Sequence, residues 1–273
     1  MSRLFAAVLY VAAGVALAFL LLPLFALFVR VSPGTLASQL TSAPAREALV
    51  VSLKTSAIAH AIVLAVGTPA AYLLATRRFR GRELVIAVLE LPLVLPPAVA
   101  GIALLAAFGR RGLLGGTFSA LGITIPFTQA AVVIAVVFVS SPFYLRWGIA
   151  AFAQLDPRLI EASRTLGAGP WRTFRRVALP LAAGGLAAAS SLAFARGLGE
   201  FGATIMFAGS VQGVTQTLPL AIYAQLENLD VALAIGALLV LVSLGILLAV
   251  KLLPSWSTFG SRSALPSAPS ASR

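Results

Sequence analysis

A charged segment between two uncharged apolar segments is the feature that most constrains this chain. Residues 156–180 read DPRLIEASRTLGAGPWRTFRRVALP, and no Asp, Glu, Lys or Arg occurs in 128–145 before them or in 181–195 after them. A soluble protein has no reason to separate charge from apolar residues so completely. A chain that crosses a bilayer must do so, because an unpaired charge is costly in hydrocarbon. The pattern therefore indicates a membrane protein.

The composition agrees, because 60% of the 273 residues are hydrophobic and only 10% are charged, far from the usual globular balance. The net charge of +12 does not indicate nucleic-acid binding, because the Arg residues lie between apolar runs instead of forming a soluble basic face. The chain has no Cys and a single His, His60, which excludes disulfides, thiolate metal sites and His-based metal clusters. We expect His60 to be satisfied by a polar partner within the helical bundle.

Six apolar runs predict an all-α membrane protein with about six transmembrane helices. The first run is too long for the apolar region of a signal peptide, so we expect it to remain as a helix. The predicted spans are 4–29, 55–76, 84–109, 128–145, 177–207 and 231–250. The predicted domains are an N-terminal transmembrane helix with an external polar connector (1–47), a transmembrane domain (48–253) and a disordered cytoplasmic tail (254–273).

The basic residues predict the orientation of these spans. Of the 20 Lys and Arg residues, fourteen lie on the side of the N-terminus, the 77–83 loop, the charged segment and the tail, five lie opposite, and Arg196 lies inside a span. Because Lys and Arg are enriched on the cytoplasmic side, both termini and the charged segment are predicted to be cytoplasmic.

The charged segment has an internal order that favours more than a plain connector, although a connector stays possible. Asp156 is placed to cap a helix that begins at Pro157, and Gly167 is placed to end it. After Gly169 and Pro170, large apolar side chains alternate with Arg residues in a second short helix. Such a surface suits docking to a partner.

The spacing within this segment resembles the signature of ABC importer permeases. The matching residues are Glu161-Ala162-Ser163, Gly167 and, at the end, Leu179-Pro180; Ser163 and Val177 depart from the residues that are commonest there. The resemblance implies a type I importer bundle whose cytoplasmic coupling helix, between spans 4 and 5, contacts a separate ATPase subunit.

The chain has no phosphate-binding loop of its own, because neither of its lysines, Lys54 and Lys251, lies in a Gly-Lys-Ser/Thr motif. We therefore expect no cofactor in this chain and expect a partner subunit to use ATP and Mg²⁺.

Charged residues inside predicted spans are candidates for a translocation pathway or gate. Arg196 and Glu200 are predicted to share one face of the fifth helix, where they either line a gate or only pack as a neutralised pair. Glu90 precedes Pro92, Pro96 and Pro97, which are expected to distort the third helix, as in broken helices near transport sites.

Four further segments narrow the resemblance to molybdate-type permeases, with sulfate-type permeases as near relatives. They are LPLVLPPAVAG from Leu91, FGRRGLLG from Phe108, LAFARGLGEFGATIMFAG from Leu192 and TLPLAIY from Thr217. The resemblance implies import of an oxyanion, molybdate or tungstate, across a bacterial or archaeal cytoplasmic membrane. It also implies three partners: a second copy of the permease, an ATPase dimer and an external binding protein.

Three alternatives stay open. A sulfate or thiosulfate permease would share the same architecture. An ion-coupled secondary transporter would use Glu90, Arg196 and Glu200 as an ion relay. An intramembrane enzyme is disfavoured, because the chain has no HExxH motif, no Cys and no Ser nucleophile beside a base.

Overall fold

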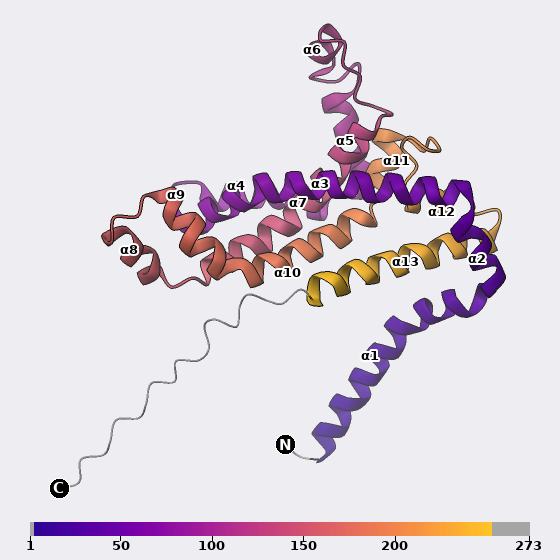
Figure 1. The fold of residues 1–273 in the computed structure, drawn as a ribbon, viewed down its shortest axis with the longest axis horizontal. Coiled ribbons are helices and arrows are strands. Elements are labelled where there is room, and N and C mark those ends of the chain that lie inside the picture. Colours follow the sequence, from indigo (N-terminus) through magenta and orange to yellow (C-terminus); the bar gives the residue numbers. More distant parts are fainter. Residues whose placement is uncertain (1–2, 253–273) are drawn as a thin grey trace. The chain divides into compact units, whose positions relative to one another are not determined.

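The structure is a computed structural model that describes residues 3–252, and every regular element within that range is a helix (Figure 1). Five helical segments are long and apolar enough to cross a membrane, and a broken pair of helices makes a sixth if it is counted as one span. The five are Arg3–Arg30 (α1), Ala43–Thr76 (α3), Gln129–Ala153 (α7), Pro170–Leu198 and Leu229–Ala249. The predicted all-α membrane protein with about six spans is thus confirmed.

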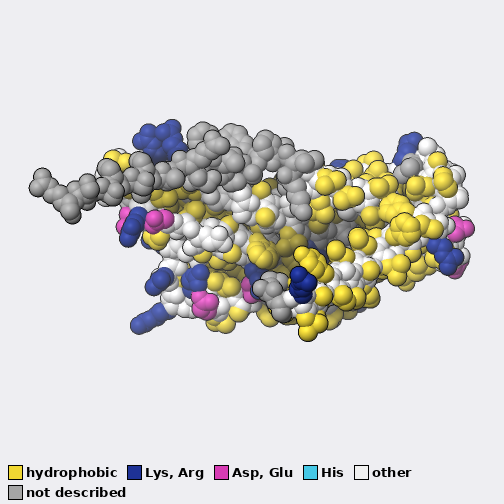
Figure 2. Space-filling view, turned by 90° about the horizontal axis from the view of Figure 1, so that it is seen from below, with side chains coloured by type: hydrophobic (Ala, Val, Ile, Leu, Met, Phe, Trp, Pro, Cys, Tyr) yellow, Lys and Arg dark blue, Asp and Glu magenta, His cyan; other side chains and the backbone are white. Residues whose placement is uncertain are grey.

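The surface of the described residues is largely apolar, as lipid-facing helices require. Helix α1 contains no buried residue, and its exposed large hydrophobic side chains are Leu, Val, Phe and Tyr. Figure 2 shows hydrophobic side chains over much of the visible face, with Lys and Arg confined to small groups. A helix that is apolar all round is not stable in water, so this surface belongs in a bilayer or against another protein.

The predicted external connector is more ordered than expected. It contains a short helix, Pro33–Thr41 (α2), and the next helix, α3, begins at Ala43 instead of Thr55. The Ser32 side chain accepts a hydrogen bond from the Thr35 N–H at 3.1 Å, and Pro33 occupies the first helical position. The N-cap and the proline both favour a helix at this point of the chain.

The third apolar run is broken where the prolines predicted a distortion. Helix Arg82–Val94 (α4) contains Pro92 and ends before Leu95, and Pro97 begins helix Pro97–Phe108 (α5). Leu95 has extended φ/ψ of −71° and 132°. A residue before proline is disfavoured in the α conformation, and Pro96 and Pro97 have no N–H to continue the helix.

The chain divides into two compact units, of which the first comprises residues 3–58, 96–136 and 198–245 of the described range. Its core joins the first part of α3 to Leu218–Ala224 (α12) and Leu229–Leu252 (α13) through buried side chains. Ser52 strengthens the contact, because its Oγ accepts a hydrogen bond from the Leu218 N–H at 2.7 Å.

A close helix pair completes this first unit. Helix α5 packs on Gly202–Ala208 (α11), and a methyl group added to Gly202 would lie 2.5 Å from Cβ of Pro97. Gly101 approaches α11 as closely, with Cβ of Met206 2.6 Å from the equivalent position. Only glycine fits at these two positions without moving the helices apart. The unit also holds the short helix Gly115–Ala120 (α6).

The second unit comprises residues 59–95, 137–197 and the described part of 246–252. Its core lies between the second part of α3, α7 and Leu179–Leu198 (α10), which run alongside one another in Figure 1. Tyr144, only 1% exposed, lies in this core and shares a 2.7 Å hydrogen bond with the hydroxyl of Thr68. This unit carries the charged segment.

Two predicted helix ends are wrong. Helix α7 continues past Leu145 to Ala153, so Arg146 lies inside a span. The fifth helix ends at Leu198 instead of about Phe207, and α11 follows as a separate element. Apolar composition continues through 198–207, but Gly197, Gly199 and Gly202 weaken helix there. The predicted tail lies outside the described residues.

Candidate functional site

The first half of the charged segment folds as the predicted short helix, Pro157–Thr165 (α8). The Asp156 carboxylate accepts a hydrogen bond from the Arg158 N–H at 2.9 Å, and Pro157 occupies the first turn. Gly167 follows the helix with φ +80°, a left-handed conformation that favours glycine. The local sequence alone therefore specifies both ends of α8.

The second half differs from the predicted separate helix. Pro170–Thr173 (α9) continues through a π-helical turn, Phe174–Ala178 (η1), directly into α10. The wider π turn accommodates one more residue per turn, so the chain keeps its helical direction. The segment is thus one free helix, a glycine turn and the start of a membrane helix.

One hydrogen bond between side chains connects the two halves. Ser163 Oγ lies 3.1 Å from Oγ1 of Thr173, and Thr173 is fully buried. The departure noted in the sequence therefore has a structural consequence, since it ties α8 to α9.

An aromatic cluster attaches the π turn to the core of the second unit. The Phe174 ring lies 4.9 Å from Tyr72 on α3 and 6.3 Å from Phe152 on α7, between ring centroids. Trp171 lies 5.7 Å from Phe174 on the outer side and is 69% exposed. A displacement of α9 would therefore act directly on α3, α7 and α10.

The signature residues divide into an exposed group and a packed group. Glu161, Ala162 and Gly167 are exposed and available to a partner, whereas Ser163 is half-buried. Leu179 packs against the core of the second unit, and Pro180 is exposed on α10. A methyl group on Gly167 would have nothing within 4 Å, so space in this chain does not explain the glycine.

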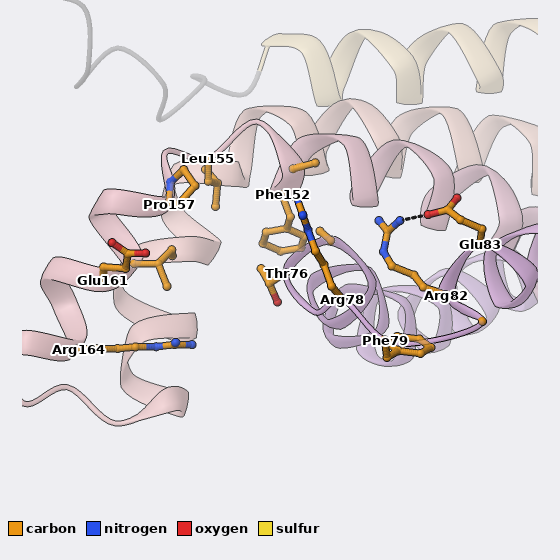
Figure 3. Close-up of a pocket in the computed structure, with 14 residues that line it drawn as sticks. Thr76, Arg78, Phe79, Arg82, Glu83, Phe152, Leu155, Pro157, Glu161 and Arg164 are labelled. Atoms are coloured by element: carbon orange, nitrogen blue, oxygen red, sulfur yellow. Dashed lines mark hydrogen bonds and ion pairs between the residues drawn. The ribbon is translucent and has the colours of Figure 1, made fainter.

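A cavity of about 850 Å³ lies beside α8, in the second unit. It is lined by the turn between α3 and α4 on one side and by the end of α7 together with α8 on the other. Figure 3 shows Arg164 projecting from α8 toward the turn that carries Arg78, and Glu161 also lines the cavity. The sequence indicated the basic turn but gave no sign of the cavity, because the two segments are distant in the chain.

Glu90 has a partner that the sequence pattern did not indicate. Arg146 Nε lies 3.9 Å from Glu90 Oε1, with the two side chains 62% and 35% exposed. The predicted end of α7 at Leu145 placed Arg146 outside the membrane, and so away from Glu90. The available signal was Glu90 itself, because a carboxylate in an apolar run needs a partner.

The predicted placement of Arg196 and Glu200 on one helix face is wrong. Arg196 lies in the last turn of α10, but Glu200 follows the end of that helix. The Glu200 carboxylate is buried and accepts a hydrogen bond from the Ala203 N–H at 2.8 Å, at the start of α11. Because the helix ends at Leu198, the four-residue spacing carries no information on a shared face.

The remaining predicted polar residue, His60, has the partner expected of it. Its Nε2 lies 2.7 Å from Ser190 Oγ, and its ring packs edge-to-face on Phe194. Among residues 3–252, no three His, Cys, Asp or Glu side chains come together as metal ligands.

The two prolines that were predicted as pathway residues, Pro96 and Pro97, lie at the break between α4 and α5.

Fold and site together define a multi-pass membrane protein that presents a short exposed helix between two spans. Residues 64–253 match the family described as "Binding-protein-dependent transport system inner membrane component". The chain belongs to this family and is an inner membrane permease of the ABC importer class.

Several relatives are similar over most of the chain. It is 45% identical over 244 residues to the "Molybdenum transport system permease protein ModB" of Mycobacterium bovis, covering 88% of this chain and 92% of that protein. The protein of the same name from Escherichia coli (strain K12) is 42% identical over 186 residues, covering 68% and 81%. A "Probable molybdenum ABC transporter permease protein" of Haloferax volcanii is 38% identical over 245 residues, covering 88% and 87%.

Solved structures support the fold. A bacterial alginate ABC transporter, in complex with its alginate pentasaccharide-bound periplasmic protein, matches with a TM-score of 0.73 at 18% identity, over 90% of this chain and 92% of that one. The methionine ABC transporter MetNI matches with a TM-score of 0.59 at 23% identity, over 77% and 96%. The chain therefore has the fold of type I ABC importer permeases.

The bond between Ser163 and Thr173 generates a prediction. We expect Ser163→Ala to speed amide hydrogen exchange in 157–166, because it removes about 1 kcal/mol of net hydrogen bonding and leaves a buried hydroxyl unpaired. Thr165→Ala is the matched control, since that hydroxyl bonds only to the Ala162 carbonyl within α8. Equal exchange rates in α8 of the two variants would show that the bond does not hold the helix.

Proposed function

We propose that this chain, paired with a second copy, forms the pathway through which an ATP-driven importer carries molybdate, or the similar oxyanion tungstate. The observation that carries the proposal is the 45% identity to a molybdenum permease over 88% of the chain. The folded charged segment, residues 156–180, is called the coupling region below. It supports the proposal, because a permease of this class needs a site where an external ATPase can act. The sulfate or thiosulfate alternative has no comparable support among these relatives.

The coupling region is proposed to dock on a cytoplasmic ATPase dimer, which hydrolyses ATP. Exposed Glu161, Ala162 and Gly167 would contact the ATPase, while Ser163, Leu179 and Pro180 position α8 and the start of α10. Nucleotide binding in the ATPase would then favour one of two bundle conformations through its different contacts with this region. An external binding protein would deliver the oxyanion from the opposite side.

The proposed orientation has the N-terminus, the tail and the coupling region in the cytoplasm. With Arg146 assigned to α7, and Arg46 and Lys54 to α3, the turn at 77–82 and the coupling region still carry more Lys and Arg residues than the loops opposite. The bias is thus unchanged by the corrected helix end.

The charged pair of Glu90 and Arg146 is proposed to line the pathway. Both side chains are partly exposed within spans of this chain, where lipid would be a costly neighbour, so their open sides should face water or the second copy. Arg146 would attract an oxyanion, and Glu90 would weaken that attraction enough for release. Arg196, half-buried in α10, stays a prediction as a gate residue, whereas we propose that Glu200 positions α11 beside Pro97.

Oxyanion uptake is the test of the proposed function. Vesicles that contain the chain with its ATPase and binding protein should take up molybdate only when ATP is present. Excess tungstate should compete and excess sulfate should not. Equal competition by sulfate would instead indicate a sulfate permease. Uptake that persists without the ATPase and collapses with the proton gradient would indicate a secondary transporter.

Gly167→Glu tests the docking site. Because the site has free space, we expect the bundle to remain folded at a strain of about 1–2 kcal/mol, while ATPase binding weakens by at least about tenfold, or ~1.4 kcal/mol. The control is Gly122→Glu, where φ is +70° and nothing lies within 4 Å. Binding measured by co-purification and titration should change only in the first variant; unchanged binding there would contradict the assignment.

Glu90→Gln tests the pathway. Removing the carboxylate leaves the Arg146 charge unopposed, so the oxyanion should be held more tightly. We expect a lower KM for uptake together with a lower maximal rate, and Arg146→Gln should raise KM. Glu227→Gln is the control, because that carboxylate is exposed in the turn before α13. Unchanged uptake kinetics in both variants would show that Glu90 and Arg146 do not line the pathway.

A further inference from the structure

The cavity beside α8 combines an apolar wall with basic side chains. Its apolar lining includes Phe79, Phe152, Leu155 and Ile160, and its charged lining consists of Arg78, Arg82, Glu83, Glu161 and Arg164. The basic residues come from two places, the turn between α3 and α4 and the last turn of α8. Such a site suits a ligand with one charged end and one apolar end.

The charges of the cavity are only partly compensated within the described chain. Arg82 forms an ion pair with Glu83, and its Nε also donates to the Leu74 carbonyl at 2.6 Å. Neither Arg78 nor Arg164 has an ion-pair partner among the described residues. Three Arg and two Glu leave a net charge of +1 in the lining.

We propose that this cavity binds the headgroup phosphate of an anionic phospholipid. A guanidinium group matches a phosphate oxygen pair in geometry, and a phosphodiester carries a single negative charge that balances the cavity. The apolar wall would contact the glycerol and the start of an acyl chain, which free inorganic phosphate lacks. Basic pockets between membrane helices at the cytoplasmic side are suited to such headgroups.

The position of the cavity gives the lipid an effect on coupling. Arg78 belongs to the turn after α3, whereas Arg164 belongs to α8, and Figure 3 shows Arg164 directed toward that turn. A phosphate held by both would tie α8 to the membrane end of α3. The lipid would thus order the helix that is proposed to dock on the ATPase. The inference rests on the proposed function in one respect: it assumes that these turns lie on the cytoplasmic side. It does not depend on which ion is transported.

Lipid retention by the full-length chain tests the proposal without any transport measurement. The chain is exposed to vesicles of phosphatidylglycerol or of phosphatidylcholine, and retained lipid is counted by native mass spectrometry. We expect retention of phosphatidylglycerol alone, and about tenfold weaker retention in Arg78→Gln/Arg164→Gln, as for the loss of charge-assisted hydrogen bonds. The control, Arg77→Gln/Arg80→Gln, loses the same charge from the same turn at two residues outside the cavity lining.

Several outcomes would overturn the proposal. Equal lipid retention in wild type and both variants would exclude the cavity as the binding site. Equal loss of retention in both variants would indicate general attraction of the lipid to the basic turn. Displacement by equimolar inorganic phosphate would make the ligand a free anion, and displacement by the ATPase subunit would make the cavity part of the subunit interface. If the first variant does not fold, as judged by circular dichroism and gel filtration, Arg78→Lys/Arg164→Lys replaces it; retention equal to wild type there would contradict bidentate binding.

Discussion

The cost of an unpaired charge or an unpaired backbone polar group in hydrocarbon governs this structure. It confines most of the described Lys and Arg residues to turns, short helices and the ends of long helices, and it requires partners for the charges that lie in or beside the spans. Glu90 lies beside Arg146, and the buried Glu200 accepts the Ala203 N–H at the start of α11. Where prolines interrupt the third span, the chain breaks and begins a new helix, because Pro96 and Pro97 have no N–H with which to continue the hydrogen bonding of α4.

Features that depend on neighbouring residues could be predicted from the sequence. Asp156 and Pro157 begin α8, Gly167 follows it in a left-handed conformation, and Pro96 and Pro97 break the third span. In each case the information lies within a few residues, in a side chain that caps a helix or a ring that fixes the backbone. The apolar run of α1 is equally local, since its length alone predicts a span.

Features that depend on distant segments could not be predicted from the sequence. Helix α7 passes through Arg146, which lies beside Glu90, 56 positions earlier in the chain. A charge in the sequence suggests the end of a span, but backbone hydrogen bonding continues wherever the side chain finds a partner. The cavity beside α8 and the Ser163–Thr173 bond likewise need segments that only the fold brings together. In the fifth span, the apolar run extends beyond the end of the helix at Leu198. Apolar composition alone does not show which of the glycines in such a run ends the helix.

The two halves of the coupling region differ in how they can act on the bundle. Helix α8 is connected to α9 by a glycine turn and one side-chain hydrogen bond. A partner that binds α8 can therefore recognise it without displacing the membrane helices. Helix α9 continues into α10 through the π turn, and Phe174 contacts Tyr72 and Phe152. A displacement there must move α10 or repack the aromatic cluster, and a packed core resists small deformations until it switches arrangement. We therefore propose that α8 serves recognition and that α9 transmits force, in agreement with the exposed signature residues Glu161 and Ala162 on α8.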